Sequence, residues 1–247
     1  MLQKAEGIII RTNDYGESHR ILTIYTREFG KVAVMARGAR KPKSHLSSST
    51  QLFTYGYFLF TKSSGMKSLR QADAVNRFNE ITVDLTLTAY SAYIVELVDK
   101  IVDDSVTNPY VFELLYQTLH YINEGKDVET LTQLFEVKML IVAGMKPVVD
   151  HCVRCKNTEG RFDFSIREGG FLCEQCFFVD PYRLQVTQKT IRLLRLYVHF
   201  DLKRLGNISV SSETKKEIKY VLDEYYQAFS GIYVKSKNFL EKLQEME

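Results

Sequence analysis

The chain has 247 residues, of which 45% are hydrophobic and 26% are charged, so it can bury a sizeable core and is somewhat long for one compact unit. No stretch approaches the ~18 uninterrupted apolar residues that span a bilayer, and the N-terminus lacks a secretory pattern, which favours a cytosolic protein. The net charge of +3 hides an asymmetry, because residues 1–79 hold 13 Lys and Arg against 5 Asp and Glu (+8), whereas residues 80–150 hold 4 against 12 (−8). A basic first third beside an acidic middle indicates a polyanionic partner, nucleic acid above all.

The first 79 residues contain short segments of strand character separated by turn residues. Apolar and β-branched runs bounded by Asn, Asp, Ser and Gly are typical of strands. The expected strands cover residues 7–11, 20–26, 31–36, 52–61 and 68–78. Strands so closely spaced predict a small β-barrel. The five-stranded oligonucleotide/oligosaccharide-binding (OB) barrel is one option, which the pattern alone does not separate from other small barrels.

A basic loop follows the third expected strand. Arg37, Arg40, Lys41 and Lys43 place four cations within seven residues, with Gly38 between them. Cations that neutralise phosphates release condensed counterions, so such a loop can supply affinity for nucleic acid without reading its sequence. A merely solvated surface loop is the alternative.

Aromatic residues dominate the fourth expected strand: Phe53, Tyr55, Tyr57, Phe58 and Phe60. Exposed rings there could stack on nucleotide bases. The period of two places Phe53, Tyr55 and Tyr57 on one face, however, and barrel core would explain that face equally well. We favour the core interpretation.

Beyond residue 80 the apolar spacing becomes helical. Asn108 is a suitable N-cap, with Pro109 at the first helical position, and Gly144 with Pro147 should end a later helix. The expected helices cover residues 87–101, 111–122, 131–142, 191–200 and 218–229. We therefore predict an α+β, multi-domain protein, with a barrel domain at 1–79 and an all-helical domain at 80–247.

The cysteines lie in two C-x2-C pairs, Cys152 with Cys155 and Cys173 with Cys176. Two such pairs about 17 residues apart fit the spacing of a structural zinc site with four thiolate ligands and no open position. We predict one structural zinc per chain in a zinc ribbon at about residues 148–180, inserted in the helical domain. Residues 161–166 and 169–172 should form a small hairpin that returns the second pair to the first. A single-iron site and ordinary reduced cysteines are the alternatives. The neighbouring His151 is expected to be an ordinary loop histidine.

The sequence shows little sign of a catalytic site. The five histidines are scattered, and all four cysteines are assigned to metal. Asp103 and Asp104 could be imagined as magnesium ligands of a nuclease, but adjacent residues at a helix end point in different directions, and an exposed helix terminus is the simpler interpretation. We expect no enzymatic activity.

These motifs together resemble the RecO family of DNA repair and recombination-mediator proteins over nearly the whole chain. No single motif is as specific as their combination. The residues that carry the resemblance are Glu6-Gly7-Ile8-Ile9, Asp14-Tyr15-Gly16-Glu17-Ser18, Arg20-Ile21-Leu22-Thr23, Gly30-Lys31, Arg37-Gly38-Ala39-Arg40-Lys41, Phe135-Glu136, Gly144, Pro147 and the two C-x2-C pairs.

The resemblance implies an OB-fold domain, a helical domain with an inserted zinc ribbon, and a cytoplasmic, nucleoid-associated protein. It further implies binding of single- and double-stranded DNA, annealing of complementary strands and, with RecR, help for RecA in replacing single-stranded DNA-binding protein. Carried onto this chain, phosphate contacts are expected at Arg37, Arg40, Lys41, Lys43, Lys31 and Arg20.

The acidic helical middle should contribute least to DNA binding. A groove there could receive a partner, including the acidic and apolar tail of single-stranded DNA-binding protein, if basic residues line it. Two other functions stay open: a zinc-ribbon scaffold for protein interactions, in which the basic loop only adds solubility, and a metal-dependent nuclease.

Overall fold

A computed structural model describes residues 1–62, 65–104, 106–206 and 209–244. The chain folds into two compact units: Met1–Lys126 with Val234–Glu247, and Asp127–Tyr233. The change from strands to helices falls near residue 80, as the sequence indicates. The chain passes from the first compact unit to the second after Lys126. A domain boundary at residue 80 stays a prediction.

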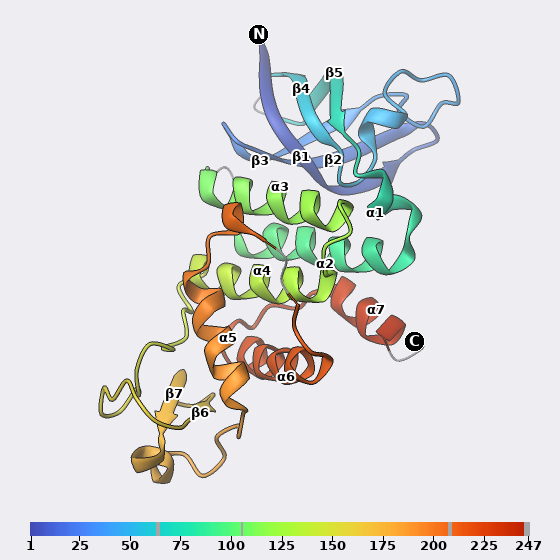
Figure 1. Cartoon of the computed structure of the whole chain (residues 1–247). Coiled ribbons are helices and arrows are strands. Elements are labelled where there is room, and N and C mark those ends of the chain that lie inside the picture. The colour runs from blue at the N-terminus through green and yellow to red at the C-terminus, as the bar shows by residue number, and fades with distance from the viewer. Residues whose placement is uncertain (63–64, 105, 207–208, 245–247) are drawn as a thin grey trace. The chain divides into compact units, whose positions relative to one another are not determined.

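Five strands of the first unit close into a barrel, as predicted. Around the barrel the strands follow the order β1-β2-β3-β5-β4, in which β3 and β5 pair in parallel and the other neighbours antiparallel, an OB-like arrangement (Figure 1). The strands are β1 (Leu2–Tyr15), β2 (His19–Thr26), β3 (Gly30–Ala36), β4 (Tyr55–Thr61) and β5 (Lys67–Asn76).

Strand β1 is much longer than the expected 7–11 because it pairs on both sides. Residues 2–8 pair with β4 and residues 7–15 pair with β2, with a shift of register between Ile9 and Arg11. A bulge of this kind bends a strand and increases its twist, which allows one strand to take part in both sides of a small closed barrel.

The barrel core takes the opposite face of β4 from the one we expected. Phe58 and Phe60 are fully buried, whereas Tyr57 is 40% exposed and Tyr55 is half-buried. Phe53 is buried but precedes the strand, and its positive φ of 68° breaks the alternation that the sequence pattern assumed. The assignment of Tyr55 and Tyr57 to the core is therefore wrong.

The helices of the first unit lie below the barrel in Figure 1. The Asn108 side chain accepts from the N–H of Val111 at 3.1 Å, and Pro109 begins the helix, so both predictions for this N-terminus are confirmed. Two helices were not predicted, because α1 is too short to show a period and α7 buries only Leu240 among its described residues. These helices are α1 (Asn79–Val83), α2 (Leu85–Ile101), α3 (Pro109–Asn123) and α7 (Lys235–Gln244).

The second unit contains helices and a small hairpin. Three predicted helices are present, and Gly144, with a φ of +75°, follows the end of the first, as expected. The elements are α4 (Val128–Val142), β6 (Phe162–Ser165), β7 (Gly170–Cys173), α5 (Gln188–His199) and α6 (Ser212–Phe229). Short 3-10 turns also occur, at η1 (Ser48–Thr50) in the first unit and at η2 (Glu174–Val179) and η3 (Leu202–Arg204) in the second.

Candidate metal centre and nucleic-acid interface

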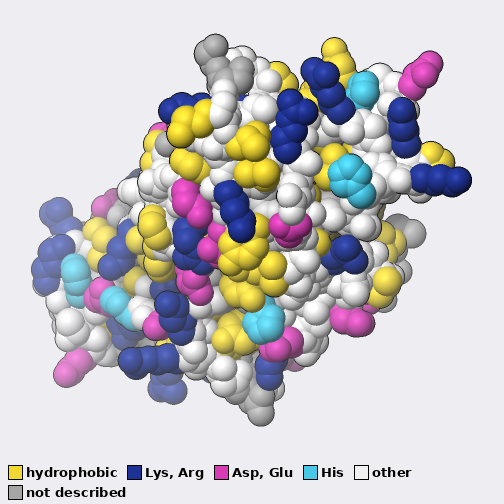
Figure 2. All heavy atoms as spheres, turned by 90° about the horizontal axis from the view of Figure 1, so that it is seen from above, with side chains coloured by type: hydrophobic (Ala, Val, Ile, Leu, Met, Phe, Trp, Pro, Cys, Tyr) yellow, Lys and Arg dark blue, Asp and Glu magenta, His cyan; other side chains and the backbone are white. Residues whose placement is uncertain are grey.

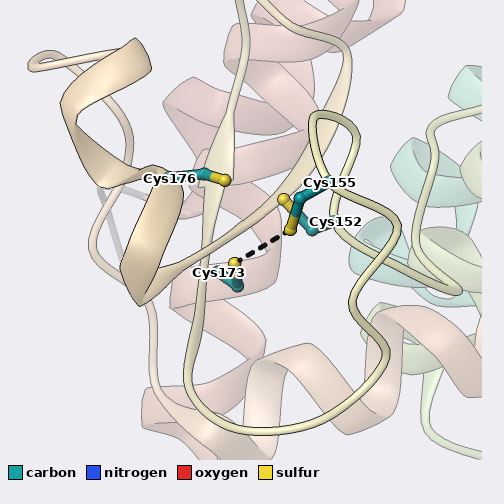
Figure 3. Close-up of side chains that lie close together, drawn as sticks. All are labelled: Cys152, Cys155, Cys173 and Cys176. Carbon is teal, nitrogen blue, oxygen red and sulfur yellow. Dashed lines mark hydrogen bonds between the residues drawn. The ribbon is translucent and has the colours of Figure 1, made fainter.

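The four cysteines converge on one point (Figure 3). Their sulfur atoms all lie within 4.8 Å of one another, and those of Cys155 and Cys173 are 3.5 Å apart. None forms a disulfide, whose sulfurs would be about 2.0 Å apart. Four sulfurs at ~2.3 Å from one tetrahedral zinc would be separated by about 3.8 Å, close to the spacing seen. The cluster predicted from the sequence is therefore present, and its donor set fits a metal ion.

A backbone knuckle and a hairpin build the cluster. The N–H of Lys156 donates to the carbonyl of Cys152 at 3.0 Å, and Lys156 takes a positive φ of 64°, which turns the first pair of thiols inward. The second pair begins at the end of β7, which pairs with β6 as the expected hairpin.

Gly170 lets these two parts approach. A Cβ atom there would lie 2.2 Å from the carbonyl oxygen of Val148, closer than any real contact. Two backbone hydrogen bonds flank this contact. Val148 N–H donates to the Gly169 carbonyl and Phe171 N–H donates to the Val148 carbonyl, both at 2.9 Å. These backbone bonds hold the segment that leads into the first knuckle against β7.

The cluster is electrostatically prepared for a cation. Burial raises the pKa of the Cys152 thiol, but N–H groups of Cys155, Cys173 and Arg154 donate to its sulfur and lower that pKa to about 6. Burial and the neighbouring thiols raise the pKa of Cys176 to about 12. One thiolate is therefore favoured while further negative charge is resisted, and a bound cation relieves that resistance.

A buried ion pair and a cation–π contact lie in the same segment of the chain as the cluster. Asp163, fully buried, accepts from Arg183 Nε at 2.9 Å, and the Arg183 guanidinium lies 4.0 Å from the centre of the Phe177 ring. His151 lies outside the thiol cluster, with its Nε2 3.2 Å from Lys156 Nζ. Among the described residues, the four cysteines are the one group of three or more His, Cys, Asp or Glu whose donor atoms gather in this way.

The basic loop, residues 37–43, belongs to the long connection between β3 and β4. Gly38 has a φ of +69° and begins a chain of tight turns, in which Lys41 N–H donates to Gly38 and Ser44 N–H donates to Lys41. Its Gly38 N–H also donates to His19 Nδ1 at 3.0 Å, and Arg40 N–H donates to Ser18 at 3.0 Å. The loop is thus an ordered extension of the β1–β2 turn.

The six cations expected to contact phosphate fall into two groups. Arg37, Lys41 and Lys43 are exposed, and no ion pair joins them to another described residue. At the right-hand edge of Figure 2, where the β3–β4 connection lies, lysine and arginine side chains project beside histidines.

The other three predicted cations already have partners. Asp14 accepts from Arg20 Nε at 3.3 Å and pairs with Arg40 Nε at 3.2 Å. Lys31, with 9% of its side chain exposed, lies 2.9 Å from Asp104 and 3.7 Å from Asp99. A phosphate would have to displace these carboxylates, so Arg20, Arg40 and Lys31 have less to gain from DNA than the exposed group.

Sequence reasoning missed two residues that hold the loop, Asp14 and His19. Both lie in the β1–β2 hairpin, where Asp14 is the direct cross-strand neighbour of Arg20 and Tyr15 that of His19. The hairpin register would have revealed the first pair, because residues opposite each other on antiparallel strands interact. No sequence signal links His19 to Gly38.

In the parts of the chain that the structure describes, each helix is too short or too polar to serve as a membrane span.

Comparison with known proteins gives consistent matches along the chain. Family profiles described as Recombination protein O N terminal and Recombination protein O C terminal match residues 1–78 and 83–238. Proteins named DNA repair protein RecO from Halalkalibacterium halodurans and Bacillus subtilis are each 50% identical to this chain, over 100% of it and 97% of their own length. The protein of that name from Bacillus cytotoxicus is 52% identical over 100% of both chains.

Proposed function

The chain belongs to the RecO family, and from this membership we propose that it is a non-catalytic DNA-binding protein of DNA repair and homologous recombination. In this proposal it binds single- and double-stranded DNA and anneals complementary strands. With RecR it helps RecA to load onto DNA coated by single-stranded DNA-binding protein. It works in the cytoplasm, on the nucleoid.

The observation that carries the DNA-binding part is the ordered basic loop. Arg37, Lys41 and Lys43 are exposed without described ion pairs, so a phosphate can bind them without breaking an existing contact. The hydrogen bonds to His19 and Ser18 fix the loop before DNA arrives, which lowers the entropic cost of binding. Arg40, Arg20 and Lys31 contribute less in this proposal, because carboxylates already neutralise them.

The four-cysteine cluster holds one structural zinc in this proposal. Cys152, Cys155, Cys173 and Cys176 would supply all four ligands, leaving no position for water or substrate. The ion would lock the hairpin and the knuckle together and so support the fold of the second unit. Elemental analysis should find one zinc per chain, and an iron-containing protein would contradict the assignment.

A groove of about 770 Å³ between α5 and the start of α6 is the proposed docking site for the tail of single-stranded DNA-binding protein. Lys189 and Arg192 line it together with Leu193 and Leu196, which suits a peptide that is both acidic and apolar. From the sequence we expected such a groove within the acidic residues 80–150. This groove lies further along the chain, at residues 189–214. An acidic peptide should lose binding when Lys189 and Arg192 are replaced by glutamine.

A salt titration of single-stranded DNA binding tests the main proposal. Fluorescence anisotropy with a thymidine oligonucleotide should give an affinity that falls log-linearly with salt. Replacing Arg37 and Lys41 with glutamine should reduce the slope by about 1.4, since each phosphate contact on a single strand contributes about 0.7. The matched control replaces Lys62 and Arg70, which are exposed on the barrel outside the loop.

Three outcomes separate the competing functions. No binding at low salt would contradict DNA binding and favour a zinc-ribbon scaffold. Cleavage of labelled DNA with magnesium, abolished by a carboxylate substitution, would identify a nuclease instead. Annealing of complementary strands coated with single-stranded DNA-binding protein would support the mediator role, since few basic proteins share that activity.

A further inference from the structure

A pocket of about 600 Å³ lies in the first unit, where η1 and the residues after it meet the end of β5 and α1. Its described lining combines hydroxyl and amide side chains with two apolar residues, Leu52 and Phe53, and one guanidinium, that of Arg77, and includes no carboxylate. The volume is in the range of pockets that hold small ligands, roughly 300–1,000 Å³. The lining therefore offers hydrogen-bond donors and positive charge.

The walls of this pocket are fixed by hydrogen bonds of their own. Phe53 keeps its positive φ because its N–H donates to Ile9 at 2.9 Å, while Ile9 N–H donates to Thr54 at 3.0 Å. Gln51 Nε2 donates to the carbonyl of Ser47 at 2.9 Å, and Thr82 Oγ1 donates to the carbonyl of Asn79 at 2.9 Å. The pocket is thus formed before any ligand binds.

Several donors in the pocket stay available. Arg77 uses one of its N–H groups to reach Ser48 Oγ, at 3.4 Å, and a guanidinium has five. The side chains of Ser47 and Asn79 make no hydrogen bond to another described residue. A ligand with several acceptor oxygens and a negative charge matches this set.

A chain of polar contacts joins the pocket to the basic loop. Arg40 and Arg20 share Asp14, at 3.2 and 3.3 Å, and Arg20 Nη1 donates to the carbonyl of Thr50 in η1 at 3.1 Å. Ser48, at the other end of η1, accepts from Arg77. A strand held by the loop can therefore continue over η1 to Arg77.

We propose that this pocket binds a backbone phosphate of the single strand whose neighbouring phosphates lie on the basic loop. Arg77 supplies the charge, and the Ser47 hydroxyl and Asn79 amide donate hydrogen bonds, as serine and asparagine often do to DNA phosphates. The inference rests on the proposed DNA binding and extends its footprint beyond residues 37–43. A free nucleotide or inorganic phosphate offers the same chemistry, and the calorimetry described below distinguishes these ligands from a DNA strand.

Anisotropy with thymidine oligonucleotides of increasing length tests the pocket. In the Arg77→Gln protein, affinity should fall about tenfold for long oligonucleotides, a typical loss for one charged hydrogen bond, and the salt slope should fall by about 0.7. Affinity should also stop rising at a shorter length than in the unchanged protein. The control is Arg70→Gln, which removes an equal charge from an exposed arginine of β5 outside the pocket and should change the affinity less than twofold, with the same length dependence.

Asn79→Ala provides a second variant, with a loss of about threefold in affinity at an unchanged salt slope. Arg77→Gln and Asn79→Ala proteins that match Arg70→Gln at every length would overturn the pocket proposal while leaving loop binding intact. Failure of the unchanged protein to bind any oligonucleotide would refute DNA binding and the pocket together.

Calorimetry with thymidine monophosphate and with inorganic phosphate tests whether the pocket binds a free phosphate compound rather than a phosphate of a DNA strand. Binding of either one that disappears in Arg77→Gln, without any length effect on oligonucleotides, would assign the pocket to a free phosphate and overturn the strand proposal. Absence of such binding together with the length effect would support it.

Discussion

Replacing Gly170 with alanine should loosen the metal centre without touching a cysteine. The added Cβ would lie 2.2 Å from the Val148 carbonyl oxygen and 2.9 Å from two Val148 carbon atoms, so β7 and the segment that leads into the first knuckle must move apart. Overpacking of this kind costs about 1–3 kcal/mol. Separation also weakens the two flanking backbone hydrogen bonds, at about 1 kcal/mol each, for a total of roughly 3–5 kcal/mol.

If the four cysteines hold the proposed zinc, metal binding and folding of this segment are coupled, so the same free energy should appear as weaker metal affinity. At 1.4 kcal/mol for each factor of ten, the proposed zinc should bind roughly a hundredfold to several thousandfold more weakly. Competition with a chromogenic chelator measures this loss, and limited proteolysis between residues 148 and 186 reports local unfolding.

Gly206→Ala is the matched control for this experiment, because nothing lies within 4 Å of a Cβ built at Gly206 in the same unit. If Gly170→Ala retained zinc against the chelator as well as Gly206→Ala does, the close approach of Val148 would not be needed for the metal centre. The reasoning from the hairpin geometry would then be refuted.

Two further substitutions examine the barrel and the C-terminal helix. Phe58→Ala should destabilise the barrel by about 3–5 kcal/mol, whereas Tyr57→Ala should cost about 1 kcal/mol or less in denaturant unfolding; similar costs would contradict the face assignment. Burial raises the pKa of Glu96, but the Ser236 hydroxyl and the N–H groups of Ser236 and Lys235 donate to the carboxylate, so the pKa is lowered overall. The pKa of Glu96 is lower in the folded protein than in the unfolded chain. The ionised carboxylate therefore stabilises the docking of α7 at pH values above the unfolded pKa of about 4.3, and this stabilisation is lost as pH falls through the folded pKa. The hydrogen-exchange protection factors of α7, which are corrected for the intrinsic pH dependence of exchange, should fall between pH 6 and pH 3, and Glu96→Gln should flatten that fall; an unaltered pH dependence in the variant would exclude Glu96 as its cause.

The outcome for β4 shows where a local pattern is insufficient. Alternation correctly predicted a strand, but Phe53 interrupts the alternation with a positive φ before the strand begins. The register against β1 and β5, set by residues far along the chain, then places Phe58 and Phe60 inside and Tyr57 outside. A shift of one residue exchanges the two faces of a strand, so the pattern could not decide between them.

The metal centre shows the opposite case. The C-x2-C spacing is local, since each pair needs only one tight turn to bring two thiols together, and the hairpin between the pairs was also visible in the sequence. The clustering of all four sulfurs could therefore be predicted. The role of Gly170 could not, because Val148 approaches it from a separate segment.

The amino-acid sequence by itself determined the five strands, the main helices with the cap at Asn108 and the end near Gly144, the cysteine cluster and the charged loop, because each depends on residues close together in the chain. The tertiary structure decided which cations of the barrel are exposed and which are neutralised. Asp14 reaches Arg40, Asp104 reaches Lys31 and Arg77 reaches Ser48 only after the barrel has closed. Pairing between distant residues, rather than composition, therefore selects the surface that is offered to a phosphate.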